Sequence, residues 1–344
     1  MENWQKQLER SIVSPAELPG LEGEERARIE GVVQRYPMRI SLHYLSLIER
    51  AGDPIWRQCV PDPRELDDDG QTDDPLDEEQ LSPVPGLIHR YPDRAVWLVS
   101  STCAMYCRFC MRKRQVGCPS LAPQPGSRDE VYDYLASTPA IRDIILSGGD
   151  PLLLDDGELE RILSRLRAIP HIEMIRIGTR VPVTLPSRIT ARLCAMLKRY
   201  HPLYINTHFN HPAEIVPASA RASTLLADAG IPLGNQTVLL SGVNDDPSVM
   251  TALMQGLLRI RVRPYYLHHP DLVKGTGHFR CTLECGIGIM ERLRGYTSGL
   301  ATPYYVVDLP GGKGKVPVLP EHLRRRGEEV LIRTYRGEWV SYDG

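Results

Sequence analysis

The chain has 344 residues, a length that suits one large α/β barrel or two ordinary domains and allows a sizeable hydrophobic core. Its formal net charge of −2 argues against nucleic acid or an anionic membrane surface as a partner. The N-terminal stretch Met1–Leu8 has no apolar signal segment, and no apolar run approaches transmembrane length. The eight cysteines then suit a reducing compartment better than a disulfide scaffold, so we expect a cytoplasmic protein.

Residues 1–80 are expected to form an N-terminal helical region that ends in an acidic linker. Trp4, Leu8 and Ile12 recur at helical spacing, and two further amphipathic runs follow within the first 57 residues. Residues 61–79 are rich in Asp, Pro and Gly. Charge runs of this kind are usually exposed, so we interpret this stretch as a solvated connecting segment.

A repeating strand–helix pattern predicts the main fold. Short apolar runs end in polar or Gly residues, and each is followed by a helix-like stretch; the runs cover residues 95–101, 143–146, 174–178, 203–207, 236–240 and 264–267. Such repeats form parallel strands with right-handed crossovers. We therefore predict an α/β fold, a partial (βα)6 TIM-like barrel over residues 81–285, with a C-terminal extension over 286–344. Catalytic groups in such barrels gather at the C-terminal ends of the strands.

Three cysteines directly after the first predicted strand are candidate metal ligands. Cys103, Cys107 and Cys110 form a Cys-x3-Cys-x2-Cys run. Three such thiolates can bind three irons of a 4Fe–4S cluster and leave the fourth iron open to a small molecule. Cys118, which precedes Pro119, is badly placed as a fourth ligand. A zinc site would also need a fourth ligand and usually has paired Cys-x2-Cys ligands.

The second predicted strand ends in Ser147-Gly148-Gly149-Asp150. The two glycines allow a ligand to approach the backbone, and the carboxylate of Asp150 can accept a hydrogen bond from an ammonium group. An ordinary strand-to-loop turn is the alternative reading of this stretch.

A Gly-rich loop near the C-terminus contains Lys315, directly before Val-Pro. A lysine in a rigid loop can form a Schiff base with pyridoxal phosphate (PLP), although an exposed loop lysine is the alternative. Arg90, Tyr91 and Arg94 lie just before the first predicted strand, and arginines suit the grip on a phosphate. A basic surface turn would explain these three residues equally well.

Taken together, the stretches 82–94, 103–110, 146–150, 206–211, 233–240 and 310–315 resemble the lysine 2,3-aminomutase family of radical S-adenosylmethionine (SAM) enzymes. The resemblance runs over nearly the whole chain. It implies an isomerase that moves the α-amino group of L-lysine to the β-carbon to give β-lysine, with a 4Fe–4S cluster, SAM and PLP as cofactors. It also implies a homo-oligomer, a small-molecule substrate, and an electron donor such as a flavodoxin or ferredoxin.

The resemblance assigns a role to each candidate residue. The cluster ligands would be Cys103, Cys107 and Cys110, and the PLP residues Lys315, Arg90, Tyr91 and Arg94. The SAM contacts would be Ser147, Gly148, Gly149, Asp150, His208 and Gln236. Substrate would be held by Arg112 at its carboxylate and by Asp271 and Asp308 at its distal ammonium. A buried cation needs such pairing, and two carboxylates would repel an acidic side chain, so glutamate-specific relatives fit poorly.

Several alternatives stay open. Arginine also carries a distal cation, so an arginine 2,3-aminomutase is the nearest rival. A relative that makes β-lysine for elongation factor P lacks the Gly-rich lysine loop. A cluster-binding regulator without turnover is the rival from another class, and SAM cleavage would exclude it.

The sequence departs from the family pattern at three places. Lys313 replaces a glycine of the lysine loop, and we favour Lys315 because it holds the position before Val-Pro. The Cys-rich zinc-binding tail of some members is absent and Asp246 stands where a partnering Cys would be, so we expect no zinc. The Cys281–Cys285 pair lacks further nearby ligands, which favours a structural role.

Overall fold

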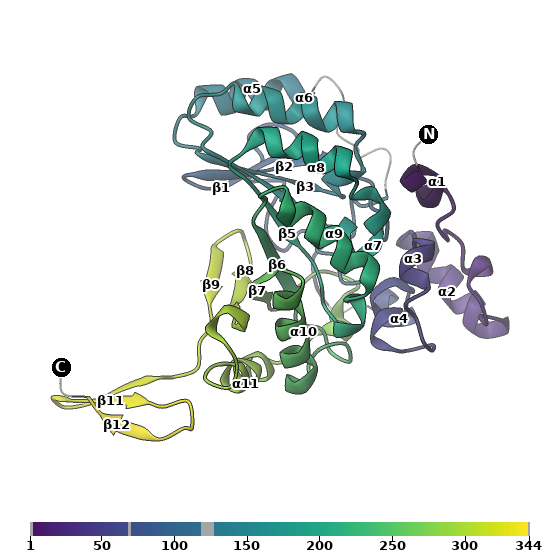
Figure 1. The fold of residues 1–344 in the computed structure, drawn as a ribbon. Coiled ribbons are helices and arrows are strands. Elements are labelled where there is room, and N and C mark those ends of the chain that lie inside the picture. Colours follow the sequence, from purple (N-terminus) through teal and green to yellow (C-terminus); the bar gives the residue numbers. More distant parts are fainter. Residues whose placement is uncertain (1–2, 68–69, 118–126, 343–344) are drawn as a thin grey trace.

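The computed structural model describes residues 3–67, 70–117 and 127–342. These form an N-terminal helical region, a large curved sheet with helices on its outer side, and a small C-terminal sheet (Figure 1). The first region contains α1 (Asn3–Glu9), η1 (Pro15–Glu17), α2 (Gly23–Arg35), α3 (Leu42–Leu45), α4 (Pro54–Cys59) and η2 (Pro63–Leu66). Polar caps fix where two of these helices begin: Ser41 accepts from the backbone N–H of Tyr44, and Asp53 accepts from those of Ile55 and Trp56. The helical N-terminal region is confirmed.

The large sheet has nine strands in sequence order. They are β1 (Leu87–Tyr91), β2 (Arg94–Ser100), β3 (Asp143–Gly148), β4 (Met174–Gly178), β5 (Leu203–Thr207), β6 (Leu233–Val238), β7 (Arg263–His268), β8 (Tyr304–Leu309) and β9 (Gly314–Pro317). Strands β2 to β8 run parallel, whereas β1 and β9 pair antiparallel at the two ends. The predicted partial barrel is confirmed, and β8 adds a parallel strand beyond the six expected.

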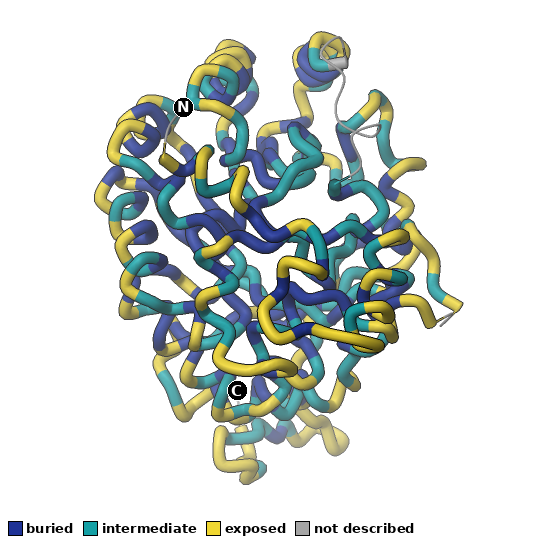
Figure 2. Tube along the Cα trace, turned by 90° about the vertical axis from the view of Figure 1, so that its right-hand side faces the viewer, coloured by how far each residue is buried: buried dark blue, intermediate teal, exposed yellow. Residues whose placement is uncertain are grey.

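The outer layer consists of α5 (Ser127–Ser137), α6 (Asp156–Arg167), α7 (Val181–Thr184), α8 (Ala191–Leu197), α9 (Pro217–Asp228), α10 (Pro247–Arg259) and α11 (Leu283–Leu293). Short 3-10 turns are η4 (Pro151–Leu153), η5 (Pro186–Arg188), η6 (Lys198–Tyr200), η7 (Pro212–Glu214), η8 (Gly277–Phe279) and η9 (Gly299–Ala301). Helix α6 shows why they pack here: its buried residues Leu159, Ile162, Leu163 and Leu166 share one helical face. The buried residues lie between helices and strands (Figure 2).

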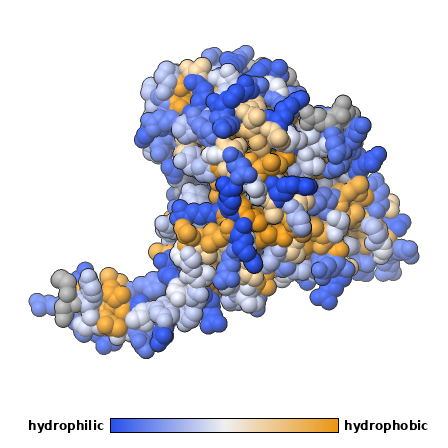
Figure 3. Space-filling view, in the orientation of Figure 1, coloured by the Kyte–Doolittle hydropathy of each residue, from blue (hydrophilic) through white to orange (hydrophobic). Residues whose placement is uncertain are grey.

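The C-terminal extension has two parts. Strands β8 and β9 form a hairpin that continues the large sheet, and it places Asp308 opposite Lys315. Strands β10 (Leu323–Arg326), β11 (Glu329–Arg333) and β12 (Trp339–Ser341) form a separate sheet that stands out from the body (Figures 1 and 3). The domain boundary at residue 285 stays a prediction. Strands β8 and β9, which lie beyond this boundary, belong to the barrel sheet.

The interpretation of residues 61–79 as solvated is wrong for part of that stretch. Glu65 and Glu78 are only 1% and 4% exposed, and Leu76 is buried with them. Backbone hydrogen bonds attach the segment to later parts of the chain. The carbonyl of Pro75 accepts from Gly311 N at 2.9 Å, and that of Thr72 accepts from Lys274 N at 3.0 Å. Both acids can be buried because basic side chains meet them, as the site geometry below shows.

No helix within the described ranges is both long and apolar enough to cross a bilayer.

Candidate active site

The cysteine loop that follows β2 is anchored by a buried ion pair. Arg108, inside the motif, donates from Nε to Glu65 Oε1 at 2.9 Å, and its backbone N–H donates to the carbonyl of Gln58 at 3.0 Å. Lys113 Nζ lies 2.6 Å from Glu65 Oε2. A buried carboxylate with two cations is strongly held in place, so this contact fixes the loop to η2.

The three thiols of the loop influence one another electrostatically, and burial removes Cys103 and Cys110 from water. Burial, together with the neighbouring acid and thiols, raises the pKa of Cys103 well above its ordinary value, and burial raises that of Cys110 to about 11. Bare thiolates are therefore disfavoured here, and a bound metal centre is what deprotonates such ligands. The donor set fits a 4Fe–4S cluster. Cys118 lies outside the described residues.

The end of β3 packs against this loop. A Cβ on Gly148, whose φ is +110°, would collide with the carbonyl oxygen of Ser100, and one on Gly149 with that of Thr102. These glycines therefore admit the cysteine loop itself. Asp150 is buried and accepts from Thr179 Oγ1 at 2.7 Å, from Leu152 N at 3.1 Å and from Arg180 N at 2.8 Å. These bonds join the ends of β3 and β4, and a contact of Ser147-Gly148-Gly149-Asp150 with SAM stays a prediction.

Lys315 lies among charged side chains at the β8–β9 hairpin. Its Nζ forms an ion pair with Asp308 Oδ2 and lies 3.2 Å from His268 Nδ1. Burial and the charge of Lys315 lower the pKa of His268, so the imidazole is neutral at pH 7. Asp308 also contacts Arg90, with 3.4 Å between Oδ1 and Nη1. The predicted aldimine lysine and one predicted substrate aspartate are thus direct neighbours.

Of the other predicted PLP residues, Tyr91 contacts Lys315 directly, and Arg90 and Arg94 lie at the Tyr91 ring. Tyr91 Oη accepts from the backbone N–H of Lys315 at 2.8 Å, and the guanidinium of Arg94 lies 3.9 Å from the centre of the Tyr91 ring. Among the described residues, none accepts from the buried Nε of Arg90. An unused buried donor beside a second arginine fits an anionic phosphate, so these residues fit PLP.

Arg112 is held by an acid that the sequence interpretation missed. Glu78 accepts from Arg112 Nε at 2.9 Å and from Nη2 at 2.6 Å, and Ser147 Oγ accepts from Nη1 at 3.3 Å. The pair is largely buried, with 14% of the Arg112 side chain exposed and 5% of that of Glu78. This bidentate pair fixes the orientation of the guanidinium.

Asp271 belongs to the same charged group. Burial and then the charge of Asp308 raise its pKa to about 7, and Glu78 adds to this, while Lys315 and Arg112 oppose it. The charges of Asp308, Lys315 and Arg112 thus all act on Asp271, so the three predicted substrate residues belong to one electrostatic group with Lys315.

The two remaining predicted SAM residues adjoin each other at the ends of β5 and β6. The His208 ring interacts with the backbone of Gln236, and burial followed by the charge of Arg180 lowers the pKa of His208 to about 3. A neutral imidazole is a polar contact for a cationic cofactor without repelling it. Their contact with SAM stays a prediction.

Three functional candidates escaped the sequence interpretation or received no role from it. Glu78 was hidden in the acidic run, where only the apolar Leu76 two residues earlier signalled burial. His268 lies only three residues before Asp271 in the sequence, but its contact with Lys315 depends on β7 and the β8–β9 hairpin meeting. Arg180 lies two residues after the third predicted strand, and its side-chain partners come from four other segments.

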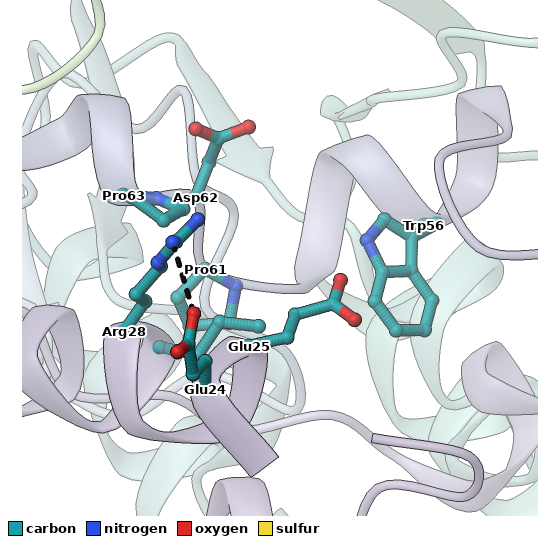
Figure 4. A pocket seen from close by; sticks show the side chains of 8 residues that line it. Glu24, Glu25, Arg28, Trp56, Pro61, Asp62 and Pro63 are labelled. Carbon is teal, nitrogen blue, oxygen red and sulfur yellow. Dashed lines mark hydrogen bonds and ion pairs between the residues drawn. The ribbon is translucent and has the colours of Figure 1, made fainter. Parts of the chain in front are cut away.

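A surface pocket away from this group lies beside α2 (Figure 4). Its lining is Glu24, Glu25, Arg28, Ile29, Trp56, Pro61, Asp62 and Pro63, and Arg28 forms an exposed ion pair with Glu24 at 3.4 Å. None of these is a predicted site residue, so this pocket is separate from the candidate active site.

Comparisons with known proteins agree with the geometry. The sequence model of the radical SAM superfamily matches residues 97–253, and a model described as lysine-2,3-aminomutase matches residues 290–344. An L-lysine 2,3-aminomutase of Fusobacterium nucleatum is 47% identical over 99% of this chain and 82% of its own length. One from Acetoanaerobium sticklandii is 48% identical over 99% of this chain and 84% of its own.

A glutamate 2,3-aminomutase of Clostridioides difficile is also 47% identical, over 93% of this chain and 76% of its own length. Overall identity therefore does not separate the two substrates, and the choice between them depends on the residues of the site. The two lysine 2,3-aminomutases are 47% and 48% identical to this chain over 82% and 84% of their own lengths. The chain therefore belongs to the lysine 2,3-aminomutase family of radical SAM enzymes.

Proposed function

We propose that this chain is an L-lysine 2,3-aminomutase, an isomerase that moves the α-amino group of L-lysine to the β-carbon and releases β-lysine. One observation carries the choice of substrate: Asp308, with Asp271 in the same buried group, binds a primary ammonium, that of Lys315. A site that holds one alkylammonium against a buried carboxylate has the chemistry to hold the distal ammonium of lysine.

The family uses a 4Fe–4S cluster, SAM and PLP. Cys103, Cys107 and Cys110 would hold the cluster, Lys315, Arg90, Tyr91 and Arg94 would hold PLP, and His208, Gln236 and the 147–150 stretch would contact SAM. When bound, the cluster and SAM supply the carbon radical that takes a β-hydrogen, and PLP supplies the conjugated carbonyl that carries the migrating nitrogen.

The residues of the chain provide binding and orientation. Arg112, fixed by Glu78 and Ser147, presents a guanidinium edge to the substrate carboxylate. Lys315 would lose its ammonium charge when it holds PLP. The carboxylate of Asp308 would then be free to pair with the ammonium of the substrate. Holding lysine at both ends keeps its α- and β-carbons in one place, which is what an intramolecular transfer requires.

The same charges oppose glutamate. Its side-chain carboxylate would meet the charges of Asp271 and Asp308, and two like charges about 4 Å apart repel by about 1 kcal/mol in water and about 4 kcal/mol near a protein surface. Substrate preference is therefore set by these two residues.

The test is an anaerobic reconstitution with iron, sulfide, PLP, SAM and a strong reductant, followed by separate incubations with L-lysine, L-arginine and L-glutamate. Mass spectrometry of derivatised products identifies the 3-amino isomers. We expect β-lysine from lysine alone. β-Arginine or β-glutamate as the main product would overturn the substrate, and cleavage of SAM without any rearrangement would overturn the aminomutase activity itself.

The proposal includes an external electron donor of the flavodoxin or ferredoxin class, a homo-oligomeric enzyme and a cytoplasmic location. The low-potential electron that the cluster requires and the oxygen sensitivity of such a centre support the first and the third.

A further inference from the structure

Arg180 places a buried guanidinium on one of the predicted cluster ligands. It follows β4, and its backbone N–H is held by Asp150 Oδ2 at 2.8 Å. Its Nη1 lies 2.9 Å from Cys107 Sγ, with 9% of the side chain exposed. The mechanism proposed above gives this residue no task.

The guanidinium is fixed on all sides. Nε donates to the carbonyl of His208 at 3.0 Å, and Nη2 donates to Gln58 Oε1 at 2.6 Å and to Glu214 Oε1 at 2.7 Å. With partners on every nitrogen, the side chain cannot turn away from Cys107 without losing buried hydrogen bonds.

Glu214 is the counter-charge of this arginine. Its side chain is fully buried, and it also accepts from Tyr44 Oη at 2.7 Å and from Asn210 N at 2.6 Å. The Arg180 guanidinium therefore contacts the predicted cluster ligand Cys107 through one terminal nitrogen and the buried carboxylate of Glu214 through the other. Buried charges screened so little by water act strongly on one another.

We propose that Arg180 is a positioning residue that sets the reduction potential of the iron–sulfur cluster through Cys107. The inference rests on the proposed function, in which Cys107 binds the cluster. Reduction transfers one electron from an external donor to the cluster, which gains one negative charge. A guanidinium N–H···S bond stabilises that more negative form, because hydrogen bonds to the sulfurs and net charge are the protein's controls on such potentials. Glu214 moderates this effect from the far side of Arg180.

The test is the potential of the cluster, measured without substrate. The full chain and its variants are reconstituted anaerobically, assayed for iron and sulfide, and titrated with titanium(III) citrate while electron paramagnetic resonance counts the reduced cluster. For Arg180→Gln we expect the ratio of reduced to oxidised cluster at a fixed solution potential to fall about tenfold, which is 59 mV for one electron. Arg180→Lys, which keeps the charge and loses the fork, should shift less in the same direction.

Two more variants separate tuning from mere structure. Glu214→Gln removes the opposing charge and should shift the potential to more positive values. Arg176→Gln, which changes an arginine of β4 that is paired with Asp143 at 2.7 Å, should leave the potential unchanged. Structural damage cannot produce opposite shifts at Arg180 and Glu214.

Each result decides the matter. A wild-type potential in Arg180→Gln with full iron and sulfide would overturn the inference, and so would a shift seen only with SAM present, which would assign Arg180 to SAM. If Arg180→Gln fails to fold, equal or same-signed shifts in Arg180→Lys and Glu214→Gln would overturn it. A wild-type chain that binds no cluster would instead overturn the proposed function.

Discussion

Asp271 and Asp308 belong to one buried group but differ in how tightly they hold a proton. Burial and the charge of Asp308 raise the pKa of Asp271 to about 7. Burial acts on Asp308 in the same direction, yet the hydrogen bond from His268 and the charge of Lys315 outweigh it and lower the pKa of Asp308. Near neutral pH, Asp308 is therefore ionised, while Asp271 titrates.

This difference predicts a pH dependence of lysine binding. Below pH 7 Asp271 becomes protonated and loses its attraction for an ammonium, so KM for lysine should rise by up to about tenfold per pH unit as the pH falls. The measurement is the initial rate of β-lysine formation at varied lysine concentration, from about pH 6 to about pH 8.5, which spans the pKa of Asp271. A KM that stays constant over this window would contradict the assignment, and Asp271→Asn should abolish the dependence.

Removal of the Asp308 carboxylate should be more damaging. Asp308→Asn leaves the distal ammonium of lysine without its ionised partner, and loss of one member of a buried charge pair costs about 2–5 kcal/mol. We expect kcat/KM for lysine to fall accordingly. Asp133→Asn, an exposed position on α5, serves as the control. Equal effects in the two variants would contradict a substrate role.

Glu78 should act through Arg112 and Asp271. Glu78→Gln loosens the guanidinium, so KM for lysine should rise more than kcat falls. Because the charge of Glu78 also raises the pKa of Asp271, the variant should show the acidic rise of KM at lower pH than the wild type. Glu79→Gln is a matched control, since the neighbouring Glu79 is 69% exposed and pairs with Arg114 instead. An unshifted pH profile would restrict Glu78 to a structural role.

Replacing each of the two lysines of the hairpin loop should have a different effect on covalent PLP. Lys315→Ala should lose covalent PLP, whereas Lys313→Ala should retain it, because Lys315 lies with Asp308, His268 and Tyr91. Borohydride reduction followed by peptide mass spectrometry locates the modified lysine. PLP on Lys313 in the wild-type chain would reverse the assignment.

The anchor of the cysteine loop is also testable. Glu65→Gln leaves two buried cations, on Arg108 and Lys113, without a carboxylate, and such a loss costs about 3–5 kcal/mol. Denaturant unfolding of the cluster-free protein measures the change, and iron content after reconstitution should fall with it. Asp67→Asn, at the exposed C-terminal end of η2, should change either quantity little. Wild-type stability in Glu65→Gln would show that the pair is not what holds the loop.

Much of this site could be predicted because its residues occupy short, dense motifs. The cysteine spacing and the Gly-rich loop before Val-Pro led to Cys107 and Lys315, and recurring apolar runs followed by helix-like stretches led to the barrel. What escaped depends on contacts between distant segments. Whether Glu65 and Glu78 are solvated or buried is decided by Arg108 and Arg112, which a charge count along the chain cannot show.

The glycines of the 148–149 pair show a second limit. A pattern of two glycines predicts that something approaches the backbone closely, but it does not say what. In the structure the approaching group is the chain's own cysteine loop, through the carbonyls of Ser100 and Thr102. The sequence shows that these two positions have no side chain, but it does not show which group fills the space.

The β8–β9 hairpin has a consequence for how such enzymes could diversify. Asp308 and Lys315 face each other across its two strands, so the aspartate proposed to hold the distal ammonium and the lysine proposed to bind PLP are neighbours in one antiparallel ladder. A crossover that exchanged this short segment between relatives would carry the positions of Asp308 and Lys315 together, while the cysteine loop stayed as inherited. Altered substrate choice in this scaffold therefore needs no rebuilding of the radical-generating half.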